Sequence, residues 1–229
     1  MRTPSIFKQK KGVTLIELLV ALAIFGIVIG AIYRLFIVQT KAYTVQDQAV
    51  EVQQNVRSAM EILLRDLRMT GYDDDNTAST ITITTPILTP VQASDVTVSY
   101  EYYDTTLAQY QRHAVRYWRD AATSTLRRQL TINDVAQPPV PETLLQNVDN
   151  LTFTYGIDAN EDGVVDDQNG DNIIDERDFV QAASVGGSKV IAVQVTLTGR
   201  PDQTNPDVRK SVSPRTLTSA VTLRNLIMK

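Results

Sequence analysis

The residues best suited to bind a ligand lie in an acidic segment, residues 158–178. This segment holds nine carboxylates and one arginine, which gives it a net charge of −8. Side chains with oxygen ligands stand at every second position, at Asp158, Asn160 and Asp162. Gly163 follows them, as in the first half of an EF-hand calcium loop. Because alternating oxygen side chains before a sharp turn are ligands that Ca²⁺ prefers, the spacing predicts a calcium site.

The same pattern begins again nine residues later, at Asp167. Asn172 replaces the turn glycine there, since asparagine tolerates positive φ. The two frames overlap, and Asn169 stands where the first frame needs its bidentate glutamate, so they cannot be two separate EF-hands. We expect one structural calcium ion, or two that share ligands; a solvated acidic loop is the alternative. The predicted ligands are Asp158, Asn160, Asp162, Asp166, Asp167, Asn169, Asp171, Asp175 and Asp178, with the backbone carbonyls of Val164 and Ile173.

Glu17 is unusual because it is a charged residue in an apolar segment. Between residues 13 and 38 only Glu17 and Arg34 are charged. About 20 apolar residues span a bilayer as a helix, so this segment is predicted to be transmembrane. A carboxylate there costs roughly 2.5–3.5 kcal/mol and usually marks function. A cut between Gly12 and Val13 would create an α-amino group that could neutralise Glu17, in the same helix or in a neighbouring subunit.

Two further features describe how this segment would lie in a membrane. Residues 1–12 carry four basic residues and no acid, which predicts a cytoplasmic leader with the rest of the chain outside. Gly26 and Gly30 form a G-x-x-x-G step, which would let helices approach closely in lipid. A secretory signal peptide would have a shorter apolar core. A plain single-pass anchor remains an alternative, although it would have no use for Glu17.

One long helix is predicted to carry the apolar segment into the rest of the chain. No proline interrupts residues 13–69, and apolar residues recur at three- and four-residue steps from Ala49 to Leu67. Gly71 is placed to end the helix. At about 1.5 Å per residue this helix would reach roughly 80–90 Å. Its first half is apolar all round and its second half has one apolar face.

After the helix the pattern changes to an alternation of period two, which predicts antiparallel strands with one apolar face. In one of them Tyr100 and Tyr102 are expected on the apolar face and Glu101 on the opposite one. Residues 138–141, with three prolines, are interpreted as a stiff connector. The predicted strands cover residues 80–84, 96–102, 113–119, 125–132, 151–155, 190–198 and 216–224.

These elements predict an α+β fold in three parts. Residues 1–12 form the leader, and residues 13–70 form the long helix, whose first half is transmembrane. Residues 71–229 form an antiparallel β-sheet domain that packs on the apolar stripe of the helix and carries the acidic loop. The domain must be stable without disulfides, because the chain of 229 residues contains no cysteine.

Composition also excludes several functions. His113 is the single histidine, so zinc sites and Cys–His catalysis are implausible. The chain contains neither a glycine-rich phosphate loop nor a G-x-S-x-G elbow, and we expect no enzyme. Without the leader's basic residues it has 18 basic and 26 acidic residues, a net charge of −8. That balance argues against nucleic acid as the main partner.

The motif K-G-V-T-L-I-E at residues 11–17, with the apolar run behind it, resembles the prepilin signature of type IV pilins and type II secretion pseudopilins. Most members have Phe where this chain has Val13. The order of the later segments looks like PilW-type minor pilins and the related J-type minor pseudopilins. These segments are L-L-Q-N-V-D-N-L-T-F-T-Y at residues 144–155, K-V-I-A-V-Q-V-T-L-T at 189–198 and T-S-A-V-T-L-R-N at 218–225.

The resemblance implies a type IV pilin-like fold and a processing pathway. A membrane prepilin peptidase would cleave after Gly12, and the new terminus at Val13 would be N-methylated. Glu17 would guide the subunit into a filament by pairing with a neighbour's amine. The implied partners are other pilin and minor pilin subunits, the peptidase, an inner-membrane assembly platform and the lipid bilayer. The implied location is the bacterial inner membrane, single pass with a periplasmic head, and later the pilus at the cell surface.

Three functions follow from these patterns. The first is a structural minor pilin of a type IV pilus, in a priming or tip-proximal position. The second is a minor pseudopilin of a type II secretion system. The third belongs to another class, a membrane-anchored extracellular binding module that uses the calcium loop as its contact surface.

Overall fold

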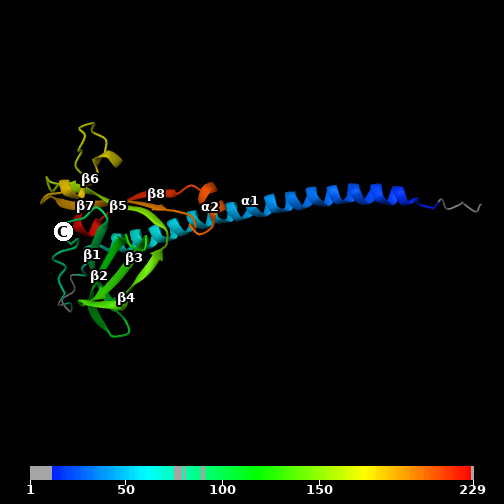
Figure 1. Cartoon of the computed structure of the whole chain (residues 1–229). Helices are drawn as coiled ribbons and strands as arrows, with labels where there is room; N and C mark the ends of the chain where they lie inside the picture. The colour runs from blue at the N-terminus through cyan, green and yellow to red at the C-terminus, as the bar shows by residue number, and fades with distance from the viewer. Residues whose placement is uncertain (1–11, 75–78, 80, 89–90, 228–229) are drawn as a thin grey trace, which may run out of the picture. The chain divides into compact units, whose positions relative to one another are not determined.

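The computed structural model describes residues 12–74, 79, 81–88 and 91–227 (Figure 1). The chain divides into two compact units, Met1–Gln46 and Asp47–Lys229. Helix α1, Leu15–Met69, has 55 residues and crosses the boundary between these units. The long helix predicted from the sequence is therefore confirmed, with its first turn two residues later than expected.

Helix α1 ends as its sequence predicts. Gly71 adopts a φ of +74°, which an L side chain rarely adopts, so glycine fits this position. The amide of Asn225 donates to the carbonyl of Thr70 at 3.1 Å and to that of Arg68 at 3.4 Å. These bonds satisfy carbonyl groups that a helix terminus leaves without intrahelical partners.

The first unit contains the apolar part of α1. Every residue from 12 to 44 is exposed. Among the described residues, α1 is one helix long and apolar enough to cross a membrane, judged by length and composition. An apolar surface of this size needs a cover from outside the unit, because water solvates it poorly.

The second unit contains two antiparallel sheets of four strands each. Sheet A has the strand order β1-β2-β3-β4, and sheet B has the order β6-β5-β7-β8. The strands of sheet A are β1 Asp95–Asp104, β2 Gln109–Asp120, β3 Thr125–Ile132 and β4 Val135–Leu145. Those of sheet B are β5 Val148–Asp158, β6 Val180–Gln181, β7 Lys189–Gly199 and β8 Arg215–Thr222. The short helices are η1 Glu176–Asp178, η2 Ala182–Ser184, α2 Pro206–Ser211 and α3 Arg224–Ile227.

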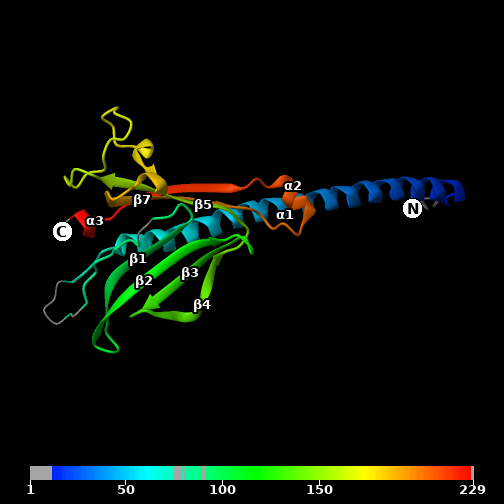
Figure 2. The same ribbon diagram turned by 60° about the vertical axis from the view of Figure 1, so that its left-hand side comes forward.

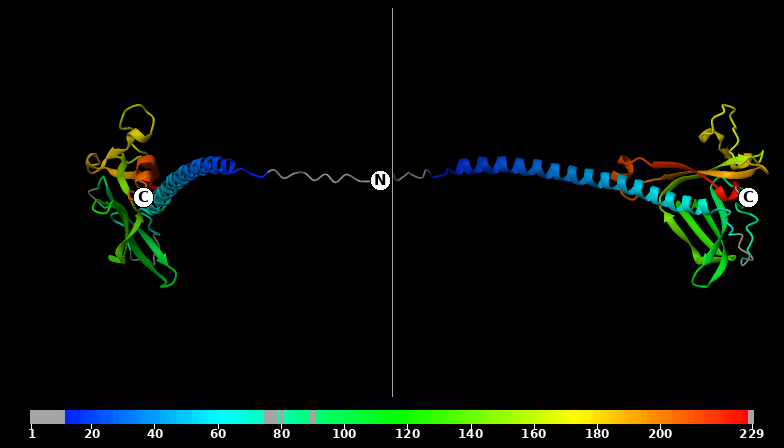
Figure 3. Two further views of the ribbon diagram at one scale, coloured as in Figure 1. Left: turned by 45° about the vertical axis from the view of Figure 1, so that its right-hand side comes forward. Right: turned by 180° about the vertical axis from the view of Figure 1, so that it is seen from behind.

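The C-terminal part of α1 lies between the two sheets (Figures 2 and 3). Its predicted stripe is buried: Val52, Val56, Ala59, Met60, Leu63 and Leu67 belong to one core cluster with residues of both sheets. Gly199 of β7 lets the helix approach closely, since a methyl group there would lie 2.6 Å from Cγ2 of Val56. The prediction that the stripe covers the strands is confirmed.

The strand predicted over residues 80–84 is wrong. Residues 81–84 form no strand, and Thr80 lies outside the described residues. Ile83 is buried, but its N–H donates to a side-chain oxygen of Asp73 at 3.4 Å rather than to a neighbouring strand. The alternating pattern of apolar and polar residues is therefore present here without a paired strand.

The connector predicted at residues 138–141 is also wrong, because these residues belong to β4. Strand β4 is the edge of sheet A, and its residues 138–141 have no register partner in β3, so the prolines interrupt no pairing of the sheet. The pairing of β3 with β4 shifts register between Arg128 and Leu130, and the peptide bond before Pro138 is cis.

The alternation predicted for β1 reverses at its end. Glu101 is 1% exposed, whereas Tyr102 is 46% exposed. The carboxylate of Glu101 accepts from the N–H of Asp74 at 2.7 Å and from the hydroxyl of Ser79. These donors come from the loop after α1, so a distant segment decides which side chain faces inward.

Candidate functional site

The N-terminal motif forms the first turn of α1. Thr14 precedes the helix, and its hydroxyl accepts from the N–H of Glu17 at 3.3 Å. The carboxylate of Glu17 accepts from the N–H and from the hydroxyl of Thr14, each at 2.9 Å. This reciprocal pair is a capping box, in which the residue before a helix and the third helical residue satisfy each other's N–H groups.

The sequence interpretation missed this role of Glu17, although the pattern T-x-x-E before an apolar run signals it. Gly12 and Val13 lie just before the cap and are exposed. A carboxylate at the helix start also interacts favourably with the helix dipole. Glu17 therefore stabilises the helix start within its own chain, and any pairing with a neighbour would come in addition.

Gly26 and Gly30 lie one turn apart on α1. A methyl group at either position would meet nothing within 4 Å. Among the described residues, nothing occupies the space beside Gly26 or Gly30, and the use of this G-x-x-x-G step as a helix-packing face stays a prediction.

The first frame of the acidic loop begins where β5 ends. Asp158 is 1% exposed, and its two carboxylate oxygens accept from the N–H groups of Asp162 and Gly163, both at 3.0 Å. Gly163 adopts a φ of +81°, as a sharp turn requires. The frame closes through Asp166, whose carboxylate accepts from the N–H of Ala159 at 2.8 Å.

The second frame repeats this geometry. One oxygen of Asp167 accepts from the N–H of Asn172 at 2.7 Å, and the other accepts from Gly170 at 2.6 Å. Donation from the Asn172 N–H holds the pKa of Asp167 below its ordinary value. Asn172 adopts a φ of +62°, as its place at the turn predicts. Asn169 accepts from the N–H of Asp171 at 2.8 Å.

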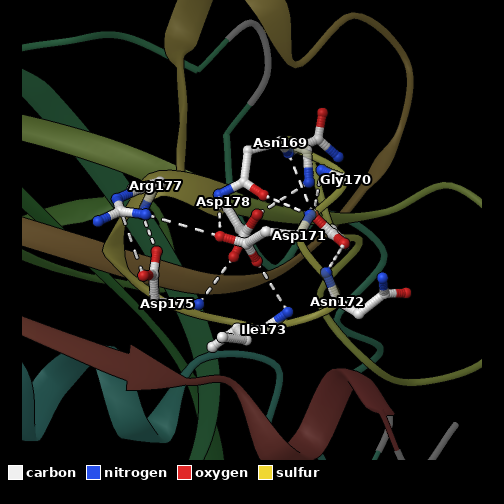
Figure 4. Close-up of polar contacts among 10 residues, drawn as sticks. Asn169, Gly170, Asp171, Asn172, Ile173, Asp175, Arg177 and Asp178 are labelled. Atoms are coloured by element: carbon white, nitrogen blue, oxygen red, sulfur yellow. Dashed lines mark hydrogen bonds and ion pairs between the residues drawn. The ribbon is translucent and has the colours of Figure 1, made fainter.

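The second frame closes through Asp178 (Figure 4). This residue is 0% exposed, and its carboxylate accepts from the N–H groups of Gln168 at 2.9 Å and Asp175 at 2.7 Å. Arg177, the single cation of the loop, lies 3.6 Å from Asp171 and 3.9 Å from Asp175. The ion pairs offset part of the repulsion among the carboxylates.

The loop fits calcium only in part. The remaining predicted ligands lie in the same turns. The side chain of Asn160 accepts from the N–H of Asp162, whose own carboxylate accepts from the N–H of Val164. In the second frame the carboxylate of Asp171 accepts from the N–H of Ile173. The residues follow one another in two turns whose oxygens bind backbone N–H groups. Over the part of the chain that the structure describes, no group of three or more His, Cys, Asp or Glu side chains is gathered to hold a metal ion. The calcium site stays a prediction.

Two comparisons with protein families match the chain. Residues 7–33 match the prokaryotic N-terminal methylation motif, which includes Gly12, Val13 and Glu17. Residues 115–225, from β2 to α3, match the type IV pilus-assembly protein W family. No curated protein and no solved structure matches the chain.

A methylation motif that opens a long apolar helix, packed on antiparallel sheets, defines the type IV pilin class. Within this class, residues 115–225 are similar to the PilW family, and the two matches together support a type IV minor pilin. These families are structural subunits rather than enzymes, and their members interact with other pilus subunits. The motif and the apolar helix indicate anchoring in the inner membrane before assembly.

Proposed function

We propose that this minor pilin is cleaved after Gly12, methylated at Val13 and incorporated into a pilus through the first half of α1, in a priming or tip-proximal position. The observation that supports the proposal most is the exposed apolar surface of residues 18–38, in which Arg34 is the one charged residue. Lipid would cover this surface before assembly, and the helices of neighbouring subunits would cover it in the filament. Prepilin peptidase and the membrane assembly platform are the partners that these steps require.

In this proposal Glu17 has two roles, which substitutions can separate. Within one chain it caps the helix through Thr14, and between chains its charge pairs with the amine at Val13 of a neighbour. Glutamine at position 17 keeps the capping bonds and removes the charge. Alanine removes the charge and the hydrogen bonds that the carboxylate accepts from Thr14.

We expect Glu17→Gln and Glu17→Ala to lower the amount of the subunit in sheared pili by about tenfold or more, because a 1.4 kcal/mol loss is already tenfold. Both variants should stay in the membrane fraction at the wild-type level. Immunoblots of the two fractions measure this. Normal incorporation of Glu17→Gln would show that capping alone explains the residue. Mass spectrometry must also find the new terminus at Val13, and an intact leader on protein from pili would refute the proposal.

The runner-up function is a minor pseudopilin of a type II secretion system. It shares the motif and the helix, so the Glu17 variants do not distinguish it. Deleting the gene does: loss of pili with normal protein secretion supports the pilus, and the opposite result supports the pseudopilus.

We also propose that the loop at residues 158–178 binds one calcium ion, or two that share ligands, with a structural role. The support is its net charge of −8, the repeated D-x-N-x-D spacing and the two similar closed turns around Asp158 and Asp167. Each carboxylate oxygen of Asp158 accepts one hydrogen bond and still carries a lone pair for a cation.

Calorimetry with the full chain in detergent tests the calcium proposal. Calcium should bind with measurable heat and raise the melting temperature, and EDTA should reverse both. Asp171→Asn should weaken binding. Asp202→Asn is the matched control, because Asp202 accepts in a similar turn from Thr204 but lies outside the loop. Absence of heat and of a melting shift would remove the ion, and with it the third function, a calcium-dependent binding module.

A further inference from the structure

Most sheet edges of the second unit are protected. In sheet A, β1 is covered by the preceding segment, since Leu88 donates to the carbonyl of Thr97 at 3.0 Å and Ser99 donates to that of Pro86 at 2.8 Å. The other edge, β4, contains the prolines of residues 138–141. Proline and covering loops are devices that keep another chain from adding a strand.

In sheet B, the β5 side is also covered. Strand β6 pairs with β5 at Thr154 and Tyr155, and the N–H of Phe153 donates to the carbonyl of Ala93 at 2.7 Å. Near its end, the carbonyl of Ile157 accepts from Asp166 at 2.9 Å. The remaining edge of sheet B is β8.

Strand β8 has none of these protections. Its eight residues, Arg215–Thr222, pair in unbroken register with β7, and the strand contains no proline. Among the described residues, its backbone hydrogen bonds are with β7 alone. Its side chains are small and polar over most of its length, and its one charge is at the first residue. A regular open edge of this kind is a template for an added strand.

The space next to this edge is lined by arginine. Strand β8 runs alongside α1 (Figure 2). Residues of both elements line two cavities. One, of about 170 Å³, is lined by Arg57 of α1 and Arg215 of β8 among others. The other, of about 500 Å³, is lined by Arg68 of α1 and by Arg224 just after β8. An added strand would lie about 4.8 Å beyond β8, and its side chains facing α1 would enter these cavities.

The charge at this edge is positive. All four arginines are exposed, and none of them forms an ion pair within the described part of the chain. Glu61 is the acid on the same face of α1, between Arg57 and Arg68. Residues 208–229 contain five basic residues and no acid. The edge therefore favours an incoming segment that carries carboxylates.

Charge also decides between two occupants. If β8 paired with β8 of a second copy, the arginines of both copies would meet, which repulsion disfavours. A segment with acids at positions i and i+4 would place two carboxylates on one face, roughly 13 Å apart. With that spacing, one carboxylate would enter the cavity beside residues 215–217 of β8, and the other would enter the cavity beside residues 220–222.

We propose that β8 is the docking strand for an extended, acid-bearing segment of a different pilus subunit, which joins sheet B as an additional strand beside α1. The identity of the partner as a pilus subunit rests on the proposed function. The docking chemistry does not, because it follows from the open edge and the four arginines.

The test uses the full chain in detergent and labelled synthetic peptides, with binding measured by fluorescence anisotropy. The probe is the peptide T-V-E-V-T-V-E-V-T. One control peptide has lysine in place of both glutamates, and a second has N-methylated amides at alternate residues, which removes strand pairing while the charges stay. We expect saturable binding of the glutamate peptide and no binding of either control.

Protein variants complete the test. The double variant Arg57→Glu, Arg215→Glu should weaken binding about tenfold or more, because it replaces two attractive contacts by repulsive ones. Arg209→Glu is the matched control, since Arg209 is exposed on α2 and does not line either cavity. It should bind the peptide as the wild type does, and circular dichroism should show that both variants are folded.

Several results would overturn the proposal. Equal binding of the N-methylated peptide would exclude strand addition, and equal binding of the lysine peptide would exclude charge recognition. Absence of binding of the glutamate peptide would also refute the proposal. So would a dimer of the chain that Arg215→Glu strengthens, because it would show that β8 pairs with a second copy. Because the peptide assay needs no filament, its outcome is independent of pilus incorporation: a chain that binds the peptide but never enters pili would refute the proposed function alone.

Discussion

The two halves of α1 differ in how their apolar surfaces are covered. In the N-terminal half every residue up to 44 is exposed, whereas in the C-terminal half the stripe from Val52 to Leu67 is buried between two sheets. Both halves carry an apolar surface, so the presence of apolar residues alone does not say what covers a helix. The sequence of the second half pairs its stripe with polar residues, and that one-sidedness marks a cover from the same chain.

Two acids of α1, one in each half, sharpen this comparison. Asp66 in the packed half is 3% exposed, and it accepts from the hydroxyl of Tyr117 at 2.6 Å and from Nη2 of Arg128 at 2.9 Å. Glu17 in the exposed half forms its described hydrogen bonds with Thr14, one turn away. An acid with distant partners in its own chain stabilises the fold, and an acid with local partners only is available to other chains.

The largest effect should come from Asp66→Ala. It breaks a buried ion pair and leaves Arg128 and Tyr117 without their shared acceptor, which typically costs about 3–5 kcal/mol of unfolding free energy. Urea denaturation followed by the fluorescence of Trp118, the single tryptophan, measures it. Glu61→Ala, on the exposed face of the same half, should change stability by less than about 0.5 kcal/mol. Equal losses in both variants would contradict the difference drawn between buried and exposed acids.

The second prediction compares two leucines of α1. Leu63 is 0% exposed, so Leu63→Ala should destabilise the second unit by about 2–5 kcal/mol through lost burial and a cavity. Leu22 is 58% exposed, and Leu22→Ala should leave the same denaturation curve unchanged. Membrane extraction or pilus incorporation, rather than head stability, should respond to Leu22→Ala. A shift of the urea midpoint by Leu22→Ala would show that the halves are not independent.

The third prediction concerns the contact of α1 with β7. Gly199→Ala forces a methyl group to within 2.6 Å of Val56 and should cost about 1–3 kcal/mol by overpacking. In the double variant with Val56→Ala, the added methyl group occupies the space that valine leaves. The two changes should therefore cost less together than the sum of their separate costs. Strict additivity in a double-mutant cycle would refute the contact.

The smallest effect should be a pH dependence at His113. Burial, followed by the charge of Arg128, lowers the pKa of His113 below its ordinary value of 6.5. The unfolded chain then binds more protons than the folded one below this value, so stability is present above pH 6.5 and is lost as the pH falls toward the folded-state pKa. His113→Gln should flatten the change in melting temperature between about pH 7.5 and about pH 5. An unchanged slope would mean that other groups cause it.

Local patterns in the sequence were sufficient for most of the elements of the fold. The course of α1, its end at Gly71 and six of the seven predicted strands follow from periodicity and turn residues, which act between near neighbours. The same applies to the turns of the acidic loop, because the Gly163 and Asn172 positions need positive φ whatever surrounds them. The capping box of Thr14 and Glu17 was equally local, and its signal was present in the sequence.

The tertiary structure alone decided which distant groups meet. It placed the strands in two sheets on either side of α1, made residues 138–141 an edge strand and turned Glu101 inward toward donors from the loop after the helix. It also left β8 open beside four arginines that are far apart in the sequence. These outcomes depend on which strand neighbours which, and periodicity along one segment carries no information about its neighbours across a sheet.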